Sequence, residues 1–367
     1  MNNEELIIVA PREPEQPANT RLARVLDAAL AEVKPRWLTT ADEAAAYFEM
    51  HPVAPGAAFA RVLFVLDLGA FGVNLEYQRL LRVLRAQPHL LEGWLGGVIV
   101  DAGSELYTKS AAQELVLAAN MSGCAFVGRS LVEGTGSLRN FTIAAHKLCH
   151  DDLMAAYIDS ACGLVRAVMT FQGYRRTMPK LTVLHASNHK TSNTFALWHA
   201  VSAELDGFAI EEIGLRNGAV QDCSGCPYKT CLHFGEKESC VYGGVMVENV
   251  YPAVKSADAI VMICPNYNDA ISANLTAFIN RLTALYRKRQ FYDKALFAVI
   301  VSGYSGCDIL AKQLIAALNM NKSFYLPGHF AIMEMANDPG AVLKLDGIDD
   351  RVRDFAHTIT HTFRPEE

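Results

Sequence analysis

The second half of the chain contains the apolar run Leu181-Thr182-Val183-Leu184-His185, followed by Ala186-Ser187-Asn188-His189-Lys190-Thr191-Ser192-Asn193-Thr194. Helical periodicity then extends over Asn193–Leu205. A buried strand that leads through a polar loop into a helix is the repeating unit of a parallel sheet covered by helices. This stretch therefore predicts an α/β fold.

The same unit recurs along the chain. We expect strands at Leu6–Ala10, Val62–Asp67, Val98–Asp101, Cys124–Val127, Leu181–His185, Ala259–Cys264, Leu296–Ser302 and Ser323–Leu326. Helical periodicity is clear at Thr20–Val33, Leu75–Arg85, Asn193–Leu205 and Asn274–Arg287. The two halves also share short matches, such as Asn19-Thr20 and Asn193-Thr194 before a helix. We interpret them as a degenerate internal duplication, although any two α/β units share some features.

The length of 367 residues predicts two domains. We place them at residues 1–175 and 176–367, because Gly173–Pro179 follows a long helical stretch and precedes a new strand. Each is expected to be a parallel sheet with helices on both faces. The second carries a cysteine-rich insert at residues 222–241.

Composition narrows the function classes. The net charge of −6 argues against a nucleic-acid partner, which needs a basic face. No run reaches the roughly 18 apolar residues of a membrane helix, and the start of the chain lacks the pattern of a signal peptide. We therefore expect a cytoplasmic protein without a membrane partner.

The polar loop after Leu181–His185 is suited to an anion. Backbone N–H groups, hydroxyls, an amide, two basic side chains and the positive end of the following helix converge on it. The candidate phosphate-binding residues are Ser187, His189, Lys190, Ser192, Asn193 and Thr194. An ordinary helix cap is the alternative. The first-half counterpart, residues 11–18, has three prolines and two glutamates, so we expect no phosphate there.

Two further loops follow the next strands in the second half. Pro265, Asn266, Tyr267 and Asn268 offer a flat surface and amide partners, and Gly303, Tyr304 and Gly306 form a glycine-containing turn. Because the carboxyl ends of parallel strands meet at one edge, these loops are expected beside the phosphate loop. Together they predict a site for a phosphorylated, flat aromatic ligand.

From residue 180 onward the chain resembles the NADPH-dependent FMN reductase and iron–sulfur flavoprotein group of the flavodoxin superfamily. The resemblance rests on three motifs: Ala186-Ser187-Asn188-His189…Asn193-Thr194, Cys264-Pro265-Asn266-Tyr267…Ser272-Ala273 and Phe278-Ile279-Asn280-Arg281. Ala186 and Asn188 depart from the Gly and Pro usual in that group. The resemblance implies a flavodoxin-like second domain. Together with the internal duplication, we expect two tandem flavodoxin-like domains, the first a degenerate copy without cofactor. The resemblance also implies FMN, with NADPH or NADH as reductant, and compatibility with a homodimer.

Four of the nine cysteines crowd into one segment, as Cys223, Cys226, Cys231 and Cys240. Four thiolates brought together by turns make a sulfur site for an iron–sulfur cluster or zinc. Iron–sulfur flavoproteins carry a compact cysteine group at this point of the chain, which implies an iron–sulfur cluster, of which 4Fe–4S is one form. Their usual cysteine spacing is tighter, so the cluster type does not carry over. Zinc, or thiols that bind no metal, remain alternatives.

We expect an FMN-dependent NAD(P)H oxidoreductase that passes hydride to the flavin and on to a small-molecule or protein acceptor. The flavin supplies the chemistry, so we assign no catalytic side chain. Two alternatives stay open: a flavin and iron–sulfur electron carrier without a substrate of its own, and a non-redox scaffold that has lost its flavin.

Overall fold

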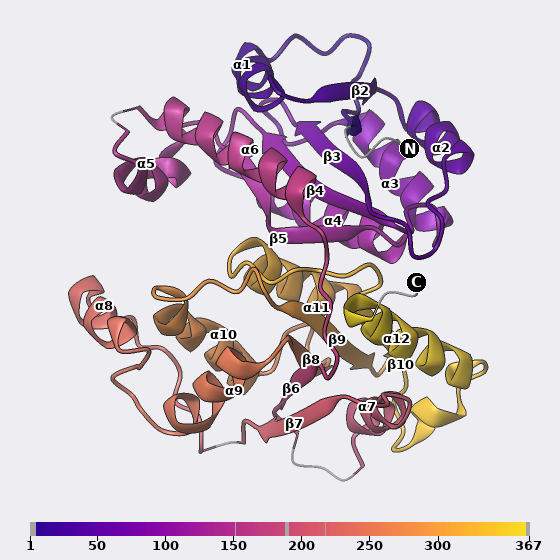
Figure 1. Cartoon of the computed structure of the whole chain (residues 1–367), viewed down its shortest axis with the longest axis vertical. Helices are drawn as coiled ribbons and strands as arrows, with labels where there is room; N and C mark the ends of the chain where they lie inside the picture. Colours follow the sequence, from indigo (N-terminus) through magenta and orange to yellow (C-terminus); the bar gives the residue numbers. More distant parts are fainter. Residues whose placement is uncertain (1–4, 151, 188–190, 217, 365–367) are drawn as a thin grey trace. The chain divides into compact units, whose positions relative to one another are not determined.

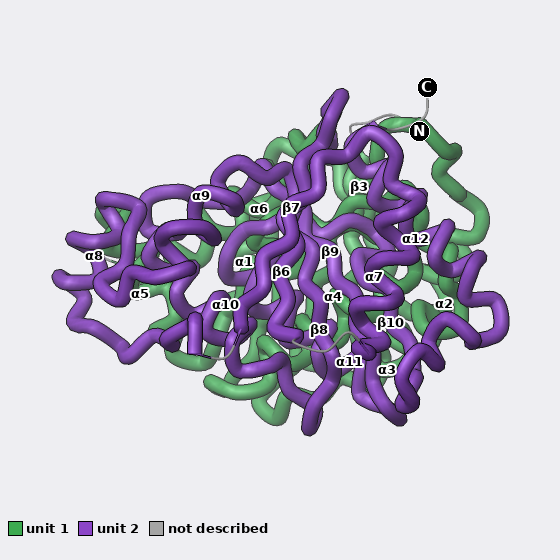
Figure 2. The backbone as a smooth tube through the Cα atoms, turned by 90° about the horizontal axis from the view of Figure 1, so that it is seen from below, with its two compact units in different colours: residues 1–172 green, residues 173–367 purple. Residues whose placement is uncertain are grey.

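The chain forms two compact units. The computed structural model describes residues 5–150, 152–187, 191–216 and 218–364. The units are Met1–Gln172 and Gly173–Glu367 (Figure 2). The division falls after residue 172, where the sequence placed it after residue 175.

Each unit contains one five-stranded sheet. The elements of the first unit are β1 (Glu5–Val9), α1 (Thr20–Ala29), β2 (Lys34–Leu38), α2 (Ala41–Met50), β3 (Ala60–Asp67), α3 (Leu75–Ala86), β4 (Trp94–Asp101), α4 (Thr108–Met121), β5 (Ala125–Gly134), α5 (Thr142–Leu148) and α6 (Leu153–Thr170). Those of the second are β6 (Lys180–His185), α7 (Asn193–Ala203), β7 (Ala209–Gly214), α8 (Tyr228–Glu236), α9 (Tyr251–Ser256), β8 (Ala259–Pro265), α10 (Ala273–Tyr286), β9 (Ala295–Ser302), α11 (Cys307–Leu314), β10 (Ala331–Met335) and α12 (Ile348–Phe363).

The two sheets have the same strand order. It is β2-β1-β3-β4-β5 in the first unit and β7-β6-β8-β9-β10 in the second, and the paired strands are parallel. Numbered within each unit, both orders read 2-1-3-4-5, which is the flavodoxin order. The predicted pair of tandem flavodoxin-like domains is confirmed.

Helices cover both faces of each sheet. In the first unit α6 contacts α1, β3, β4 and β5, whereas α3 packs between α2 and α4. Figure 1 shows α6 lying across the strands of that sheet. In the second unit α7 packs with α12, and α11 packs on β9 and β10. Right-handed crossovers require this division of the helices between the two faces.

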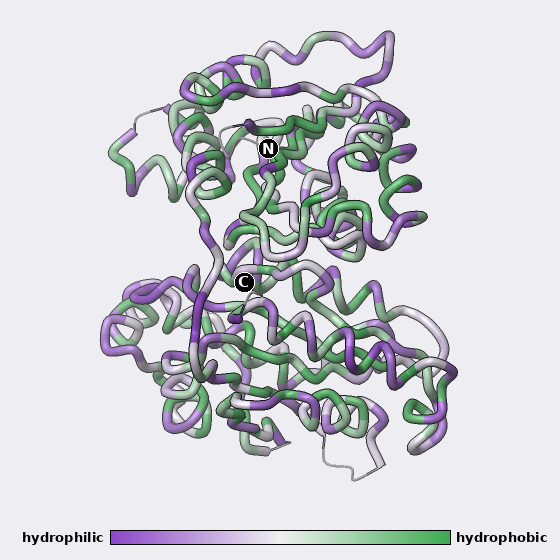
Figure 3. Tube along the Cα trace, turned by 45° about the vertical axis from the view of Figure 1, so that its right-hand side comes forward, coloured by the Kyte–Doolittle hydropathy of each residue, from purple (hydrophilic) through white to green (hydrophobic). Residues whose placement is uncertain are grey.

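The central strands are buried along their whole length. All eight residues of β4 and of β9 are buried, as are all seven of β8. Figure 3 shows the apolar colour concentrated on the strands inside each unit. This burial on both faces explains why these strands read as continuous apolar runs.

Three strands differ from the expectation. The edge strands β2 and β7 carry mostly exposed or half-buried side chains, so they have no apolar run that would predict them. The expected strand at Ser323–Leu326 is wrong: it makes an isolated bridge, between Tyr325 and Ala295. Pro327 follows and has no N–H for a ladder, and the fifth strand is β10 instead.

Helix α6 is long and apolar enough, by length and composition alone, to cross a membrane. It is the one such helix among the described residues. Its buried side chains include Tyr157, Leu164 and Val168, and it contacts three strands of its own sheet. This packing is that of a core helix.

The carboxyl edge of the first sheet is filled by the unit's own side chains. Asp101, at the end of β4, is fully buried and accepts hydrogen bonds from Arg21 Nη2 (2.7 Å) and Nε (3.1 Å). Asn19 Nδ2 donates to Asp101 at 2.8 Å and to Asp67 at 3.2 Å, and the Tyr157 hydroxyl donates to Asp101 at 3.1 Å. Two carboxylates and their donors thus occupy the position where ligands bind in this fold.

Replacing Arg21 by Ala should destabilise the first unit, because the Asp101 carboxylate would stay buried without its cationic partner. Losing one partner of a buried ion pair costs about 3–5 kcal/mol. The control is Arg85→Ala, which breaks the exposed Arg85–Glu114 pair and should cost about 0–1 kcal/mol. Urea unfolding of both variants measures the difference, and equal losses would contradict this account of the Arg21–Asp101 pair.

Candidate functional site

The expected phosphate loop leads into the N-terminus of α7. Ser192 is the N-cap residue, and its hydroxyl accepts the Phe195 N–H at 3.4 Å. The first N–H groups of an eleven-residue helix, with its positive dipole end, therefore face the loop. The expected residues His189 and Lys190 lie outside the described residues.

The side chain of Asn193 forms hydrogen bonds to the segment that follows β10. Its side-chain Nδ2 donates to the carbonyl oxygens of Ala336 (3.0 Å) and Asp338 (2.8 Å), and its Oδ1 accepts from Val342 N at 3.5 Å. The side-chain amide therefore joins the start of α7 to the segment after β10. The backbone N–H of Asn193, rather than its amide, is the donor left for a phosphate.

The loop after β8 makes a tight turn. Tyr267 and Ala270 form an antiparallel bridge, and Asn268 and Asp269 between them both have left-handed backbones (φ +55° and +56°). Two consecutive positive φ values characterise the type I′ turn, which Asn and Asp tolerate. The turn presents the Tyr267 ring, which is 60 % exposed, at the edge of the sheet.

Asn266 connects this turn to the loop after β9. Its Nδ2 donates to the carbonyl oxygen of Ser305 (2.9 Å), to Ser302 Oγ (3.2 Å) and to Asp269 Oδ1 (3.2 Å). Its Oδ1 accepts from Asp269 N at 2.9 Å. This amide therefore holds the two loops together, and its expected contact with a ligand stays a prediction.

The three loops enclose one cavity of about 530 Å³, within the usual range for small-molecule sites. Of the expected residues, those lining it are Ser192, Asn193, Thr194, Pro265, Asn266, Tyr267, Asn268, Gly303 and Tyr304. Ser187 and Gly306 lie outside the lining. The sequence interpretation missed Thr191, Asp269, Val301, Ser302, Ser305, Ala336 and Asn337. The first five belong to or adjoin the predicted loops. The last two follow β10, a strand that the sequence interpretation did not predict at Ala331–Met335.

Gly306 packs against two polar side chains of the turn after β8. It precedes α11 with φ +90°, and a Cβ built there would lie 2.3 Å from Asp269 Oδ1 and 2.8 Å from Asn266 Nδ2. Both the backbone conformation and the close approach of these polar atoms require glycine. The packing of the turn after β8 therefore depends on this position.

Burial shifts the pKa of three groups near the strand ends toward the neutral form. Burial lowers the pKa of His185, at the end of β6, although a backbone hydrogen bond of Ser187 opposes the shift. Burial raises the pKa of the Cys307 thiol and raises that of Cys264 to about 12. Both thiols stay protonated at neutral pH, so neither provides a thiolate nucleophile beside the cavity.

The four clustered cysteines lie between β7 and α9. Cys223 and Cys226 precede α8, Cys231 lies within it and Cys240 follows it. All four are free thiols, of which Cys223 is exposed and the others are half-buried. Among the described residues, no three of these sulfur atoms lie within 4.8 Å of one another.

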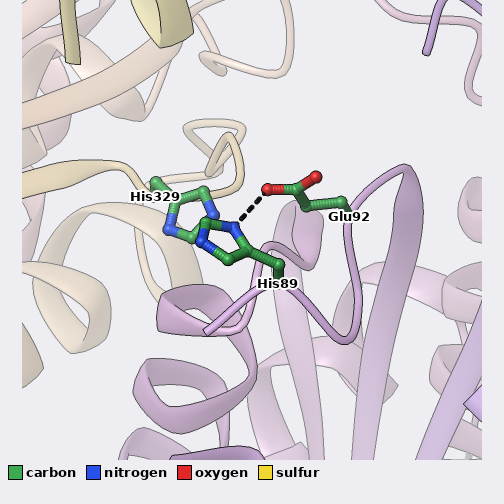
Figure 4. A group of neighbouring side chains, drawn as sticks. All are labelled: His89, Glu92 and His329. Carbon is green, nitrogen blue, oxygen red and sulfur yellow. Dashed lines mark hydrogen bonds and ion pairs between the residues drawn. The ribbon is translucent and has the colours of Figure 1, made fainter. Parts of the chain in front are cut away.

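An imidazole and a carboxylate also pair in the first unit. His89 Nδ1 lies 2.6 Å from Glu92 Oε1 in the turn after α3 (Figure 4). Their side chains are 74 % and 56 % exposed. A pair this exposed is an ordinary surface interaction that contributes little to stability.

Residues 179–338 match the model of the NADPH-dependent FMN reductase family. This match covers the three loops and confirms the resemblance stated from the sequence. No curated protein sequence is significantly similar to the chain.

Solved structures resemble half of the chain. An NAD(P)H:quinone oxidoreductase from Methanothermobacter marburgensis is 15 % identical over 50 % of this chain and 98 % of its own, with a TM-score of 0.40. An FMN-dependent NADH-azoreductase from Bacillus anthracis, in complex with FMN, is 16 % identical over 50 % and 99 %, with a TM-score of 0.35. Values this low carry no functional assignment. The family match shows that residues 179–338 are similar to the NADPH-dependent FMN reductase family.

Proposed function

We propose that the chain is an FMN-dependent NAD(P)H oxidoreductase whose cofactor binds in the cavity of the second unit. One observation carries the proposal: the N-terminus of α7, the loop after β8 and the loop after β9 all line one cavity of about 530 Å³. The family match supports the same cofactor. Bound FMN would accept hydride from NAD(P)H and pass electrons to an acceptor.

The residues present fit FMN at both ends. Thr191, Ser192 and Thr194, with the first N–H groups of α7, line the end suited to the phosphate. Tyr267 and Tyr304, which are 60 % and 79 % exposed, border the end suited to the flat ring. The turn after β8, fixed by Asn266, and the turn after β9 set the width of that end. The role of these residues is to bind and orient.

The proposal assigns one FMN to each chain. The first unit has Pro11, Pro14 and Pro17 where a phosphate loop would need donors. Its Asp67 and Asp101 carboxylates lie at the strand ends, where they would repel a phosphate. We therefore propose that residues 1–175 are a degenerate copy without cofactor. The net charge of −6 supports a function without nucleic acid, and a cytoplasmic location and a homodimer stay predictions.

The proposal includes a sulfur site at Cys223, Cys226, Cys231 and Cys240. Four thiols in one segment are the donor set of an iron–sulfur cluster or of zinc. A single tetrahedral Zn²⁺, with Zn–S about 2.3 Å, would hold its sulfur atoms about 3.8 Å apart. A cluster accepts the same four thiolates, so zinc stays the alternative to it. A cluster would also suit an electron carrier, which is the second candidate function.

The test is the visible spectrum and the turnover of the full chain purified without oxygen. We expect one FMN per chain and consumption of NADPH or NADH in the presence of a quinone or free flavin. A flavin-containing protein that consumes neither nucleotide would favour the electron carrier. A colourless protein that binds no added FMN would contradict the proposal, and two FMN per chain would contradict the assignment to the second unit alone.

Ser192→Asp should abolish FMN binding while preserving α7. Aspartate caps helices as well as serine does, but its charge would repel the phosphate. We expect riboflavin, which lacks the phosphate, to bind the variant as it binds the wild type. Ser192→Asn is the matched control, because it is a good cap without charge and should retain FMN. Equilibrium titration with both flavins gives the comparison, and equal FMN affinity in the Asp and Asn variants would place the phosphate elsewhere.

Gly306→Ala should weaken FMN binding at least about tenfold, because the new methyl group would displace the Asp269 carboxylate and with it the turn after β8. The control is Gly340→Ala, a position with φ +74° and no atom within 4 Å of the added Cβ. It suffers the same backbone strain without the clash. FMN dissociation constants decide the question, and a matching loss in the two variants would mean that backbone strain alone is responsible.

A further inference from the structure

One buried arginine joins the two ends of the cysteine segment. Arg281, on α10, is 3 % exposed. Its Nη1 donates to the carbonyl oxygen of Gln221 at 3.2 Å, and its Nη2 donates to that of Gly243 at 2.7 Å. These carbonyls lie just before Cys223 and just after Cys240. A single planar guanidinium therefore fixes the span that contains all four cysteines.

One N–H donor of the Arg281 guanidinium makes no hydrogen bond to the described residues. Its Nε is buried and has no hydrogen-bond partner among the described residues. A buried donor left unsatisfied costs free energy, and a nearby ion is one of the things that can offset this cost. A full positive charge at this depth also needs a negative partner, whereas both atoms it donates to are neutral carbonyl oxygens.

The thiols lie around this arginine. Cys231 Sγ accepts a hydrogen bond from Arg287 Nε at 3.3 Å. Cys226 Sγ donates to the Tyr242 hydroxyl at 3.6 Å, and the Arg281 guanidinium carbon lies 6.0 Å from the centre of the Tyr242 ring. Arg281 of α10 and Arg287, the residue that follows this helix, thus both lie close to the cysteine segment.

Cys223 is located by a further contact. Near it, the Tyr251 hydroxyl donates to the Arg281 carbonyl oxygen at 2.6 Å. The backbone N–H of Cys223 donates to Asp222 Oδ1, which also accepts from Asn280 Nδ2 at 3.1 Å. Three of the four cysteines are therefore linked, directly or through one neighbouring residue, to a residue of α10 or to Arg287 just after it.

Helix α8 is held close to the same end of α10. A Cβ at Gly235 would lie 2.8 Å from the carbonyl oxygen of Ala284, so only glycine permits this approach. The Arg287 guanidinium carbon lies 4.7 Å from the centre of the Tyr228 ring at the start of α8. The helix that carries Cys231 is thereby fixed against the arginines.

We infer that Arg281 is the positioning residue of the four-cysteine site and, with Arg287, supplies the positive charge that offsets its ligands. The inference rests on the sulfur site of the proposed function. Four thiolates around Zn²⁺, or around a 4Fe–4S cluster of charge +2, leave a net charge of about −2. Two arginines supply +2. The site would then bear no net charge where it meets the buried side of α10.

The test is a Co²⁺ titration of the metal-free full chain, followed by the thiolate-to-cobalt absorption. We expect Arg281→Gln to weaken Co²⁺ binding about 10- to 100-fold, as the loss of residues that orient metal ligands does. Arg281→Lys keeps the charge but cannot reach both carbonyls, so it should recover only part of the affinity. Arg289→Gln removes an exposed charge just beyond the same helix and should bind as the wild type does.

The outcomes separate this inference from the proposed function. Wild-type affinity in Arg281→Gln would overturn the role of Arg281 and leave the sulfur site standing. A wild-type chain that binds no Co²⁺ would overturn both, whereas its FMN content would still judge the flavin site. FMN binding also reports whether each variant is folded. If Arg281→Gln loses FMN as well, Arg281→Lys decides: retained FMN with weakened Co²⁺ supports the inference, and unchanged Co²⁺ affinity overturns it.

Discussion

The side-chain amide of Asn266 fixes the shape of the cavity in the second unit. Its three donor contacts and one acceptor contact join the turn after β8 to the turn after β9. Loops at strand ends lack the ladder that orders a sheet, so without such a link they would move independently. The left-handed pair Asn268–Asp269 and the glycine at 306 both serve this link. The aromatic border of the cavity depends on it.

The sequence predicted the second unit's fold and most of its cavity because both depend on local rules. A strand buried on two faces must be a continuous apolar run, and Ala259–Cys264 and Leu296–Ser302 are such runs. The loops that follow them had to meet at one edge. The edge strands β2 and β7 and the lining residues Ala336 and Asn337 escaped prediction. Their position depends on pairing between distant segments, which no local pattern encodes.

The hydrogen-bond partners of individual side-chain amides could not be predicted from the sequence either. Asn193 and Asn266 look like ligand donors in their loops, yet the structure uses both side chains to join separate segments. A side-chain amide at a strand end can hydrogen-bond to a ligand or to a neighbouring loop with the same donor and acceptor atoms. The two cases differ in whether a backbone carbonyl, such as that of Ala336 or Ser305, lies within hydrogen-bond distance. Both residues are far along the chain from the amide, so the sequence does not show this.

The two units have the same topology but differ at the carboxyl edge of the sheet, where ligands bind in this fold. Both sheets have the same order, and in both the carboxyl edge is where side chains converge. In the first unit Arg21, Asn19 and Asp101 satisfy one another there, so the edge is occupied by internal contacts. In the second unit the corresponding edge stays open and helix α10 begins beside it. Arg281 lies eight residues after Ala273, about 12 Å along the helix. Helix α10 therefore connects the turn after β8, where it begins, to the cysteine segment that Arg281 contacts.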